Sequence, residues 1–272
     1  MIFSGLVSIT FRQLNPRDII ELVSCAGLNG IEWGGDIHVP HGDIKTAKEV
    51  LHLTIESGLS VSAYGSYYKV GCVDRNFENF KKIVETGVAL KAPTIRVWAG
   101  EKISAAADIE YRKNVVEGSR LIADIAKKAG ITISFEFHSG TLMDTNESAI
   151  QFLKEINHNY VKTYWQPNLN MDIGQKLEGL KWISPMLTNI HVFYWAKDDA
   201  GNTTRNPLRN GEKDWKIYFN YIHNLPGYHY AMIEHVKNDE PDQFLEDAKV
   251  LKDLIRNSSM QDLNKWGNVN EF

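Results

Sequence analysis

Short apolar runs alternate with longer amphipathic stretches along nearly the whole chain. The short runs are rich in β-branched and aromatic residues and are bounded by turn residues, a pattern typical of buried strands. We expect eight strands, near residues 2–9, 30–35, 59–67, 94–99, 131–138, 161–167, 188–195 and 229–236. Apolar residues at helical spacing follow each run, and we expect helices over residues 16–27, 43–57, 74–90, 107–129, 148–157, 172–183, 213–224 and 240–256.

This alternation of strand and helix predicts parallel strands joined by crossover helices, which is an α/β fold. Eight such units in one domain favour a single (β/α)₈ TIM barrel over residues 1–256, followed by a polar C-terminal tail over residues 257–272. An open, doubly wound sheet is the alternative. A phosphate-cradling glycine loop would support that alternative, and the sequence contains neither GxGxxG nor GxxxxGK[ST].

Composition indicates which binding partners and which cell compartment to expect. The 272 residues carry a net charge of −4, which gives no reason to expect nucleic acid or an anionic membrane as a partner. The two cysteines, Cys25 and Cys72, are too few for a disulfide framework, and we expect both to be reduced in a cytoplasmic protein. The N-terminal residues lack the pattern of a secretory signal, and no apolar run approaches the roughly 18 residues of a membrane span.

Four polar side chains lie at the ends of strands five to eight: Glu136, Gln166, His191 and Glu234. In a closed barrel these positions meet at the C-terminal mouth, where active sites of this fold lie. Two carboxylates, one imidazole and one amide oxygen suit one divalent metal ion such as Mn²⁺, Zn²⁺, Co²⁺ or Mg²⁺. The structural alternatives are glutamates that face solvent, a histidine paired within the core, and a glutamine that simply ends its strand before Pro167.

The same site suits proton transfer. Glu136 and Glu234 on one metal are candidates for the catalytic acid and base, on opposite faces of a carbonyl substrate. One carboxylate would remove a proton from the carbon next to the carbonyl, and the other would return it, while the metal stabilises the enediolate oxygen. This chemistry predicts isomerisation or epimerisation of a sugar.

Aromatic and basic side chains near the strand ends are candidates for substrate binding. Aromatic faces pack against the C–H faces of sugars, and the polar loop over residues 196–215 offers Arg205 and Arg209 to a phosphate, carboxylate or polyol. Core packing and solvent exposure are the structural alternatives, and a second metal at His38 and His41 is a minor one. The substrate-binding candidates are Trp33, His38, Tyr64, Trp98, His138, Trp165 and Arg205.

These motifs, from EWGGDIHVPHGD through EFHSGTLMDT and YWQP to the final IEH, cover nearly the whole chain. The chain resembles the xylose isomerase-like (β/α)₈ superfamily, in particular its sugar phosphate isomerase/epimerase branch (AP endonuclease family 2-like). The resemblance implies a metal-dependent enzyme of carbohydrate metabolism that acts on a small sugar or sugar phosphate. It also implies a metal bound by Glu136, Gln166, His191 and Glu234, and a homodimer or homotetramer formed through the outer helices.

Gln166 departs from the family pattern, because an aspartate is usual at this ligand and a histidine usually follows shortly after it. A neutral oxygen there predicts weaker metal binding or altered chemistry. A dehydratase of a cyclic polyol ketone is the nearest alternative, since it shares the metal and the proton abstraction. A non-catalytic sugar-binding barrel is another alternative. A DNA-repair hydrolase related to endonuclease IV is disfavoured, because it requires several metals and a basic surface.

Overall fold

Eight parallel strands close into a barrel in the computed structural model, which describes residues 1–71 and 77–258. Each strand pairs with its neighbour in the order β1-β10-β7-β6-β5-β4-β3-β2, and β1 closes the ring by pairing with β10 from Ile2↔His229 to Leu6↔Ile233. The barrel strands are β1 (Ile2–Val7), β2 (Gly30–Gly34), β3 (Ser60–Lys69), β4 (Thr94–Trp98), β5 (Thr132–Phe135), β6 (Val161–Trp165), β7 (Leu187–Val192) and β10 (His229–Ile233).

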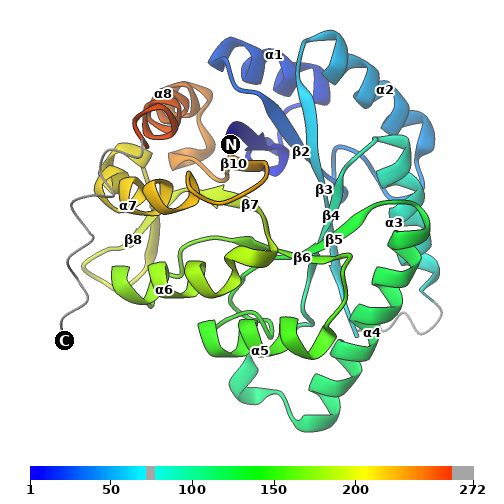
Figure 1. The fold of residues 1–272 in the computed structure, drawn as a ribbon. Helices are drawn as coiled ribbons and strands as arrows, with labels where there is room; N and C mark the ends of the chain where they lie inside the picture. The colour runs from blue at the N-terminus through cyan, green and yellow to red at the C-terminus, as the bar shows by residue number, and fades with distance from the viewer. Residues whose placement is uncertain (72–76, 259–272) are drawn as a thin grey trace.

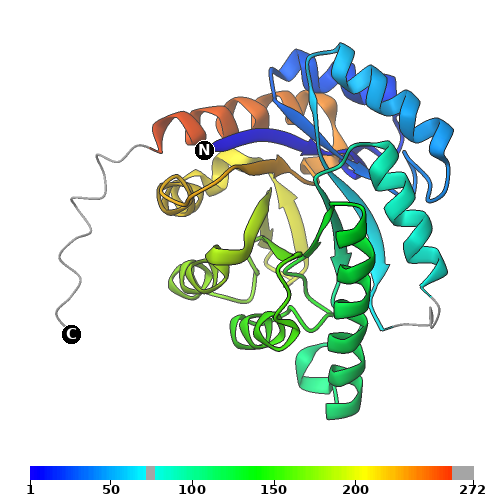
Figure 2. The same ribbon diagram turned by 45° about the vertical axis from the view of Figure 1, so that its right-hand side comes forward.

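Helices surround this barrel on the outside (Figure 1). The last helix, α8, packs beside α1, so the helical layer closes where the sheet closes (Figure 2). The α-helices are α1 (Pro16–Ala26), α2 (Ile44–Glu56), α3 (Glu78–Ala89), α4 (Ile109–Lys128), α5 (Asn146–Ile156), α6 (Ile173–Ile183), α7 (Glu212–Ile222) and α8 (Pro241–Asn257). The short 3₁₀ helices are η1 (Ser8–Phe11), η2 (Ser104–Ala106), η3 (Ser184–Met186), η4 (Leu208–Gly211) and η5 (Lys237–Asp239).

Local chemistry explains the helix ends, as α1 illustrates. The Asn15 side chain accepts hydrogen bonds from the backbone N–H groups of Arg17 and Asp18, which would otherwise lack partners. Pro16 occupies the first helical position, where its missing N–H costs nothing. Gly27 ends the helix at φ 65°, a left-handed conformation that glycine adopts without strain.

The predicted (β/α)₈ barrel is confirmed, but several predicted elements differ in extent. Several strands are shorter than expected, and the largest differences are that β5 ends at Phe135, β7 at Val192 and β10 at Ile233. Beyond β7, residues expected to be partly a loop form an antiparallel hairpin of β8 (Tyr194–Lys197) and β9 (Thr203–Asn206), with Trp195 opposite Arg205. Of the helix predicted over residues 74–90, the described part begins at Glu78, and the predicted polar tail lies outside the described residues from 259 onward.

The hydrophobic core has two layers. The larger layer fills the space between strands and helices. The smaller cluster joins Val7, Ile9, Ala63, Tyr164 and Met232, which come from β1, η1, β3, β6 and β10. Strands on different sides of a barrel can share contacts only through its interior, so this cluster packs the inside of the barrel, as is usual for the fold.

No helix within the described residues is both long and apolar enough to cross a membrane. Cys25 is a free, exposed thiol on α1, and Cys72 lies outside the described residues.

The contact between α8 and η4 generates a prediction about stability. Asp247 on α8 is buried, and its Oδ1 accepts hydrogen bonds of 2.9 Å from the Leu208 backbone and from the Gln243 side chain. Burial raises the pKa of Asp247 to about 6. Ionisation of Asp247 is therefore less favourable in the folded protein than in the unfolded chain, and it lowers the free energy of unfolding. This loss of stability is absent below the pKa of Asp247 in the unfolded chain and is complete once the pH has risen above 6.

Asp247→Asn keeps an acceptor oxygen and removes the charge. We expect it to raise the free energy of unfolding at pH 8 by up to about 3 kcal/mol, and by about a third of that at pH 4.5. Urea unfolding at the two pH values measures both effects. Asp253→Asn on the exposed face of α8 is the control and should change stability by less than about 0.5 kcal/mol. A gain that is the same at both pH values would contradict this account.

Candidate active site

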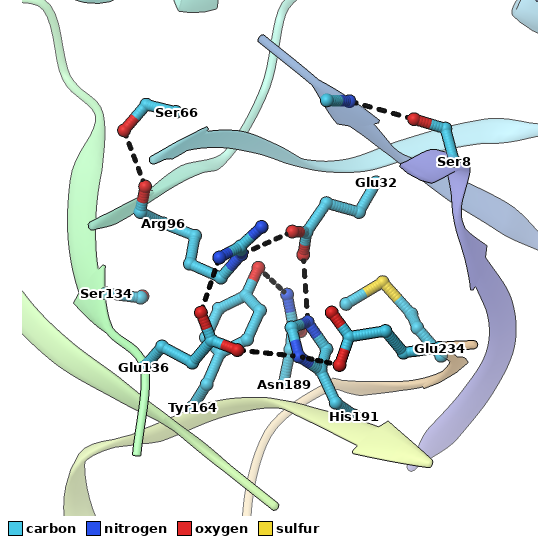
Figure 3. A network of polar contacts seen from close by, with 12 residues as sticks. Ser8, Glu32, Ser66, Arg96, Ser134, Glu136, Tyr164, Asn189, His191 and Glu234 are labelled. Atoms are coloured by element: carbon cyan, nitrogen blue, oxygen red, sulfur yellow. Dashed lines mark hydrogen bonds and ion pairs between the residues drawn. The ribbon is translucent and has the colours of Figure 1, made fainter. Parts of the chain in front are cut away.

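Charged side chains from five strands meet at the C-terminal mouth of the barrel (Figure 3). Glu32 lies on β2, Arg96 on β4 and His191 on β7, whereas Glu136 and Glu234 directly follow β5 and β10. All five residues are buried, with exposed fractions between 0% and 7%. Charges so deeply buried are costly unless they are paired or bind a metal, and their contacts therefore define the site.

His191 is the centre of the predicted ligand set. Its Nδ1 lies 3.3 Å from Glu136 Oε1, 3.3 Å from Glu234 Oε2 and 3.3 Å from Gln166 Oε1. Its Nε2 lies 3.5 Å from Glu32 Oε2. The structure thus brings together all four residues that the sequence singled out, although they are separated by up to 98 positions along the chain.

Arg96 holds two of the carboxylates in place. Its Nε donates to Glu32 Oε1 at 2.6 Å, and its Nη1 donates to Glu136 Oε2. Glu136 Oε2 also accepts from the indole N–H of Trp98 at 2.5 Å. Room for this arrangement depends on Gly65, because a Cβ there would lie 2.7 Å from Glu32 Oε1 and 2.8 Å from Arg96 Nη2.

The two buried cations keep the carboxylates ionised. Burial alone would raise the pKa of Glu32 and of Glu136, but Arg96 and His191 outweigh it and hold both pKa values below the ordinary one. For Glu234, burial is outweighed by His191, and its pKa is also lowered. The reverse holds for His191: burial would lower its pKa, but the surrounding glutamates raise it.

This donor set fits a divalent metal ion. Atoms that share a metal at about 2.0–2.2 Å lie roughly 3–3.5 Å apart, and the oxygens around His191 Nδ1 have this spacing. The three carboxylates of Glu32, Glu136 and Glu234 exceed the one permanent cation, Arg96, by two charges (3 − 1 = 2), which a divalent cation would neutralise. Among the described residues, Glu136, His191 and Glu234 form the one group of three acidic, histidine or cysteine side chains with ligand geometry. The second metal considered at His38 and His41 therefore finds no support.

The site opens into a cavity of about 400 Å³, which matches a molecule the size of a monosaccharide. Two of the predicted substrate-binding residues line it, Trp98 and His138, and their rings stack with centroids 4.8 Å apart. The remaining lining consists of Ile9, Arg12, Tyr67, Arg96, Glu136, Phe137, Ser139, Gln166, Pro167, Asn168, Leu169, Asn170, Phe193, Trp195, Lys197, Thr203, Glu234 and His235.

Three predicted substrate-binding aromatics lie elsewhere, because strand residues alternate between the two faces of the sheet. Trp33 follows the inward-facing Glu32 and packs in the outer core. Tyr64 is likewise in the outer core, where its hydroxyl donates to the Val39 carbonyl at 2.7 Å. Trp165 packs edge-on against the α7 ring of Trp215. These three expectations are corrected by the structure.

Two further candidates are engaged with other protein groups. His38 is buried and its Nδ1 lies 2.9 Å from the Ser8 hydroxyl, outside the cavity lining. Arg205, on β9, forms an ion pair with Asp239 at 2.6 Å, and its guanidinium lies 5.9 Å from the Trp195 ring centroid. Arg205 therefore ties the β8–β9 hairpin to the segment after β10, and it is not among the residues that line the cavity.

Neither Arg96 nor Glu32 was singled out from the sequence. A signal was present for both, because each interrupts an apolar strand segment, TIRVW and GIEWG, as Glu136 does. A charge inside a parallel strand that is covered on both faces requires a partner. The sequence does not show that these two residues are partners of each other.

Comparisons with known proteins match most of the chain. A family model described as a xylose isomerase-like TIM barrel matches residues 20–254. A 3-dehydroshikimate dehydratase of Bacillus anthracis is 24% identical over 176 residues, a match that spans 62% of this chain and 60% of that relative's length.

Solved structures agree in fold. The probable 3-DHS dehydratase AsbF of Bacillus anthracis has a TM-score of 0.78 at 20% identity, covering 93% of this chain and 99% of that one. D-psicose 3-epimerase of Clostridium cellulolyticum H10 has a TM-score of 0.69 at 14% identity, covering 93% and 98%. A xylose isomerase-like barrel of Mycobacterium smegmatis, solved with magnesium, has a TM-score of 0.70 at 15% identity, covering 94% and 98%.

The pairing of Arg96 generates a prediction about stability. Arg96→Met leaves Glu32 and Glu136 buried without their main cation. We expect the free energy of unfolding, measured with urea in metal-free buffer, to fall by about 3–5 kcal/mol. Arg256→Met is the matched control, because Arg256 pairs with Asp253 at the surface, where both side chains are more than half exposed, and it should cost no more than about 1 kcal/mol. Equal losses in the two variants would show that the Arg96 network does not support the fold.

Proposed function

Because this chain belongs to the xylose isomerase-like TIM barrel family, we propose that it is a metal-dependent isomerase or epimerase of a sugar or sugar phosphate. The observation that carries the proposal is the position of two ionised carboxylates. Glu136 and Glu234 both lie 3.3 Å from the same nitrogen of His191, and both line one cavity of about 400 Å³. Two bases at one point can act on a single carbon centre or on two adjacent ones.

Under this proposal each residue of the site has a role in metal binding, in proton transfer or in both. Glu136, Gln166, His191 and Glu234 would hold a divalent cation, and a cation bound there would supply Lewis-acid polarisation of the substrate carbonyl. One of the two glutamates removes the proton from the carbon next to the carbonyl. The other glutamate delivers a proton to the neighbouring carbon, or to the opposite face of the same carbon. Arg96 keeps Glu136 ionised and oriented, because it binds the other oxygen of that carboxylate.

A dehydratase is the second candidate, and similarity to known dehydratases favours it. The first step would be the same proton abstraction, and a hydroxyl group on the next carbon would then leave as water. That departure requires a proton donor, and His138 lines the cavity beside Trp98. In this reading the electron pair from the broken C–H bond forms a C=C bond conjugated with the carbonyl.

The first experiment measures the metal content of the purified protein by mass spectrometry. We expect about one equivalent of Mn, Zn, Co or Mg in the wild type and its loss in Glu136→Gln/Glu234→Gln. A control variant, Glu49→Gln/Glu246→Gln, removes two exposed carboxylates and should retain the metal. No metal in the wild type after reconstitution with Mn²⁺ and Zn²⁺ would contradict the proposed mechanism.

The metal-loaded protein is then incubated in D₂O with ketoses, ketose phosphates, inososes and 3-dehydroshikimate. Deuterium incorporation next to the carbonyl with retention of all oxygens indicates an isomerase or epimerase. A conjugated product with near-ultraviolet absorption and loss of water indicates a dehydratase. Binding without either reaction supports the non-catalytic sugar-binding alternative. Any conversion should be lost in the double glutamate variant.

Gln166 generates a separate prediction. Its Oε1 lies 3.3 Å from His191 Nδ1, so Gln166→Asp places a third ligand carboxylate at the metal position. We expect calorimetry to show at least tenfold tighter Mn²⁺ binding. Asn170→Asp adds the same charge at the cavity wall, on an exposed residue whose Oδ1 already accepts a hydrogen bond from Lys197, and should change affinity far less. Equal gains would mean that the effect is only long-range attraction. Tighter binding without any activity would favour a non-catalytic barrel.

A further inference from the structure

Four polar atoms of cavity-lining residues have no hydrogen-bond partner among the described residues: Arg96 Nη2 within the charged network, and Tyr67 Oη, Trp195 Nε1 and His235 Nδ1 outside it. Each is shielded from solvent. Folded proteins rarely leave such atoms unpaired, because an unmade hydrogen bond costs the full desolvation of the group. Their concentration around one cavity indicates that their partners belong to a ligand.

The backbone supports the same interpretation for two of them. Tyr67 has φ 56° and His235 has φ 55°, left-handed conformations that are unfavourable for residues with a side chain. Tyr67 lies where the β3–β4 pairing shifts register, between Gly65 and Tyr68. His235 directly follows Glu234, and its backbone N–H donates to Thr10 Oγ1 at 3.0 Å. Backbone strain of this kind concentrates at ligand sites, where it directs a side chain.

The Tyr67 ring is fixed against the catalytic network. The Arg96 guanidinium lies 4.5 Å from its centroid, and the Trp98 ring meets it edge-on at 5.6 Å. Arg96 and Trp98 both donate hydrogen bonds to Glu136. The Tyr67 hydroxyl therefore has a defined position relative to one candidate base. On the other side, the ring of His235, which adjoins Glu234, lies 5.8 Å from that of Trp195.

We propose that Tyr67, with Trp195 and His235, forms a hydrogen-bonding subsite that holds oxygens of the substrate other than the reacting carbonyl. This inference rests on the proposed function and specifies the substrate class, an oxygen-rich small molecule such as a polyol ketone. Tyr67 acts as a substrate-positioning residue whose hydroxyl donates a hydrogen bond and keeps its proton. Burial raises the pKa of that phenol, which suits a donor that does not ionise.

The test compares Tyr67→Phe with Tyr218→Phe. Tyr218 is the matched control because its hydroxyl is also buried without a partner, but its ring packs on Trp165 and Trp215 outside the cavity. Neither variant should lower the urea midpoint of the ligand-free protein, since neither removes a hydrogen bond within the protein. Both should bind the metal as the wild type does. A lowered midpoint in Tyr67→Phe alone would show that the hydroxyl has a protein partner, and would overturn the inference.

The KM and kcat of the metal-loaded proteins are then measured with 3-dehydroshikimate and D-tagatose as probes. We expect Tyr67→Phe to raise the KM of a converted probe at least tenfold with a smaller change in kcat, and Tyr218→Phe to change neither. Turnover with an unchanged KM in Tyr67→Phe overturns the inference and leaves the proposed function standing. If a probe binds without turnover, calorimetry decides: at least tenfold weaker binding by Tyr67→Phe supports the subsite although the proposed reaction fails. Failure of the wild type to bind either probe overturns the inference.

Discussion

The pairing of Arg96 with Glu32 and Glu136 is the interaction on which the rest of the site depends. A single guanidinium bridges carboxylates from β2 and β5 in the dry interior of the barrel, with all three side chains at most 2% exposed. Unpaired charges at this depth would be expelled or neutralised. Because Arg96 holds one oxygen of Glu136, the other oxygen faces His191. A histidine binds a metal in its neutral form, and with His191 neutral the three carboxylates exceed Arg96 by two charges, an excess that suits the barrel mouth to a divalent cation.

The alternation of side chains between the two faces of each strand determines which residues face the site and which face the helices. Inward positions carry the charged network and the small apolar cluster that contains Tyr164, whereas the large rings of Trp33 and Trp165 face the helices. The cavity takes its walls from Tyr67, Arg96 and Trp98 on β3 and β4, from residues beyond the ends of other strands, and from the β8–β9 hairpin. Arg205 contributes from outside, since its ion pair with Asp239 ties the hairpin to the segment after β10.

One proton abstraction serves both reactions considered for this site. Epimerases and dehydratases with this fold share the need for an ionised carboxylate beside a polarised carbonyl, and the buried cations keep Glu136 ionised. The outcome depends on the group that faces the neighbouring carbon. In the proposed epimerase Glu234 would return a proton, whereas in the proposed dehydratase a proton donor at the cavity wall, for which His138 is the candidate, would help the hydroxyl leave as water. Gln166 makes this chain differ from the pattern with a third ligand carboxylate, because it contributes a neutral oxygen at 3.3 Å from His191.

The sequence by itself determined the barrel and four residues of its mouth. Eight repeats of an apolar run and an amphipathic stretch leave few topologies, and polar residues at the ends of consecutive parallel strands must converge. Only the tertiary structure decided which polar groups are partners. The contact of Arg96 with Glu32 joins positions 64 residues apart, and Tyr67 lines the cavity from a position with a left-handed backbone. Periodicity cannot specify either feature, because both depend on register between strands and on conformations that break the regular pattern.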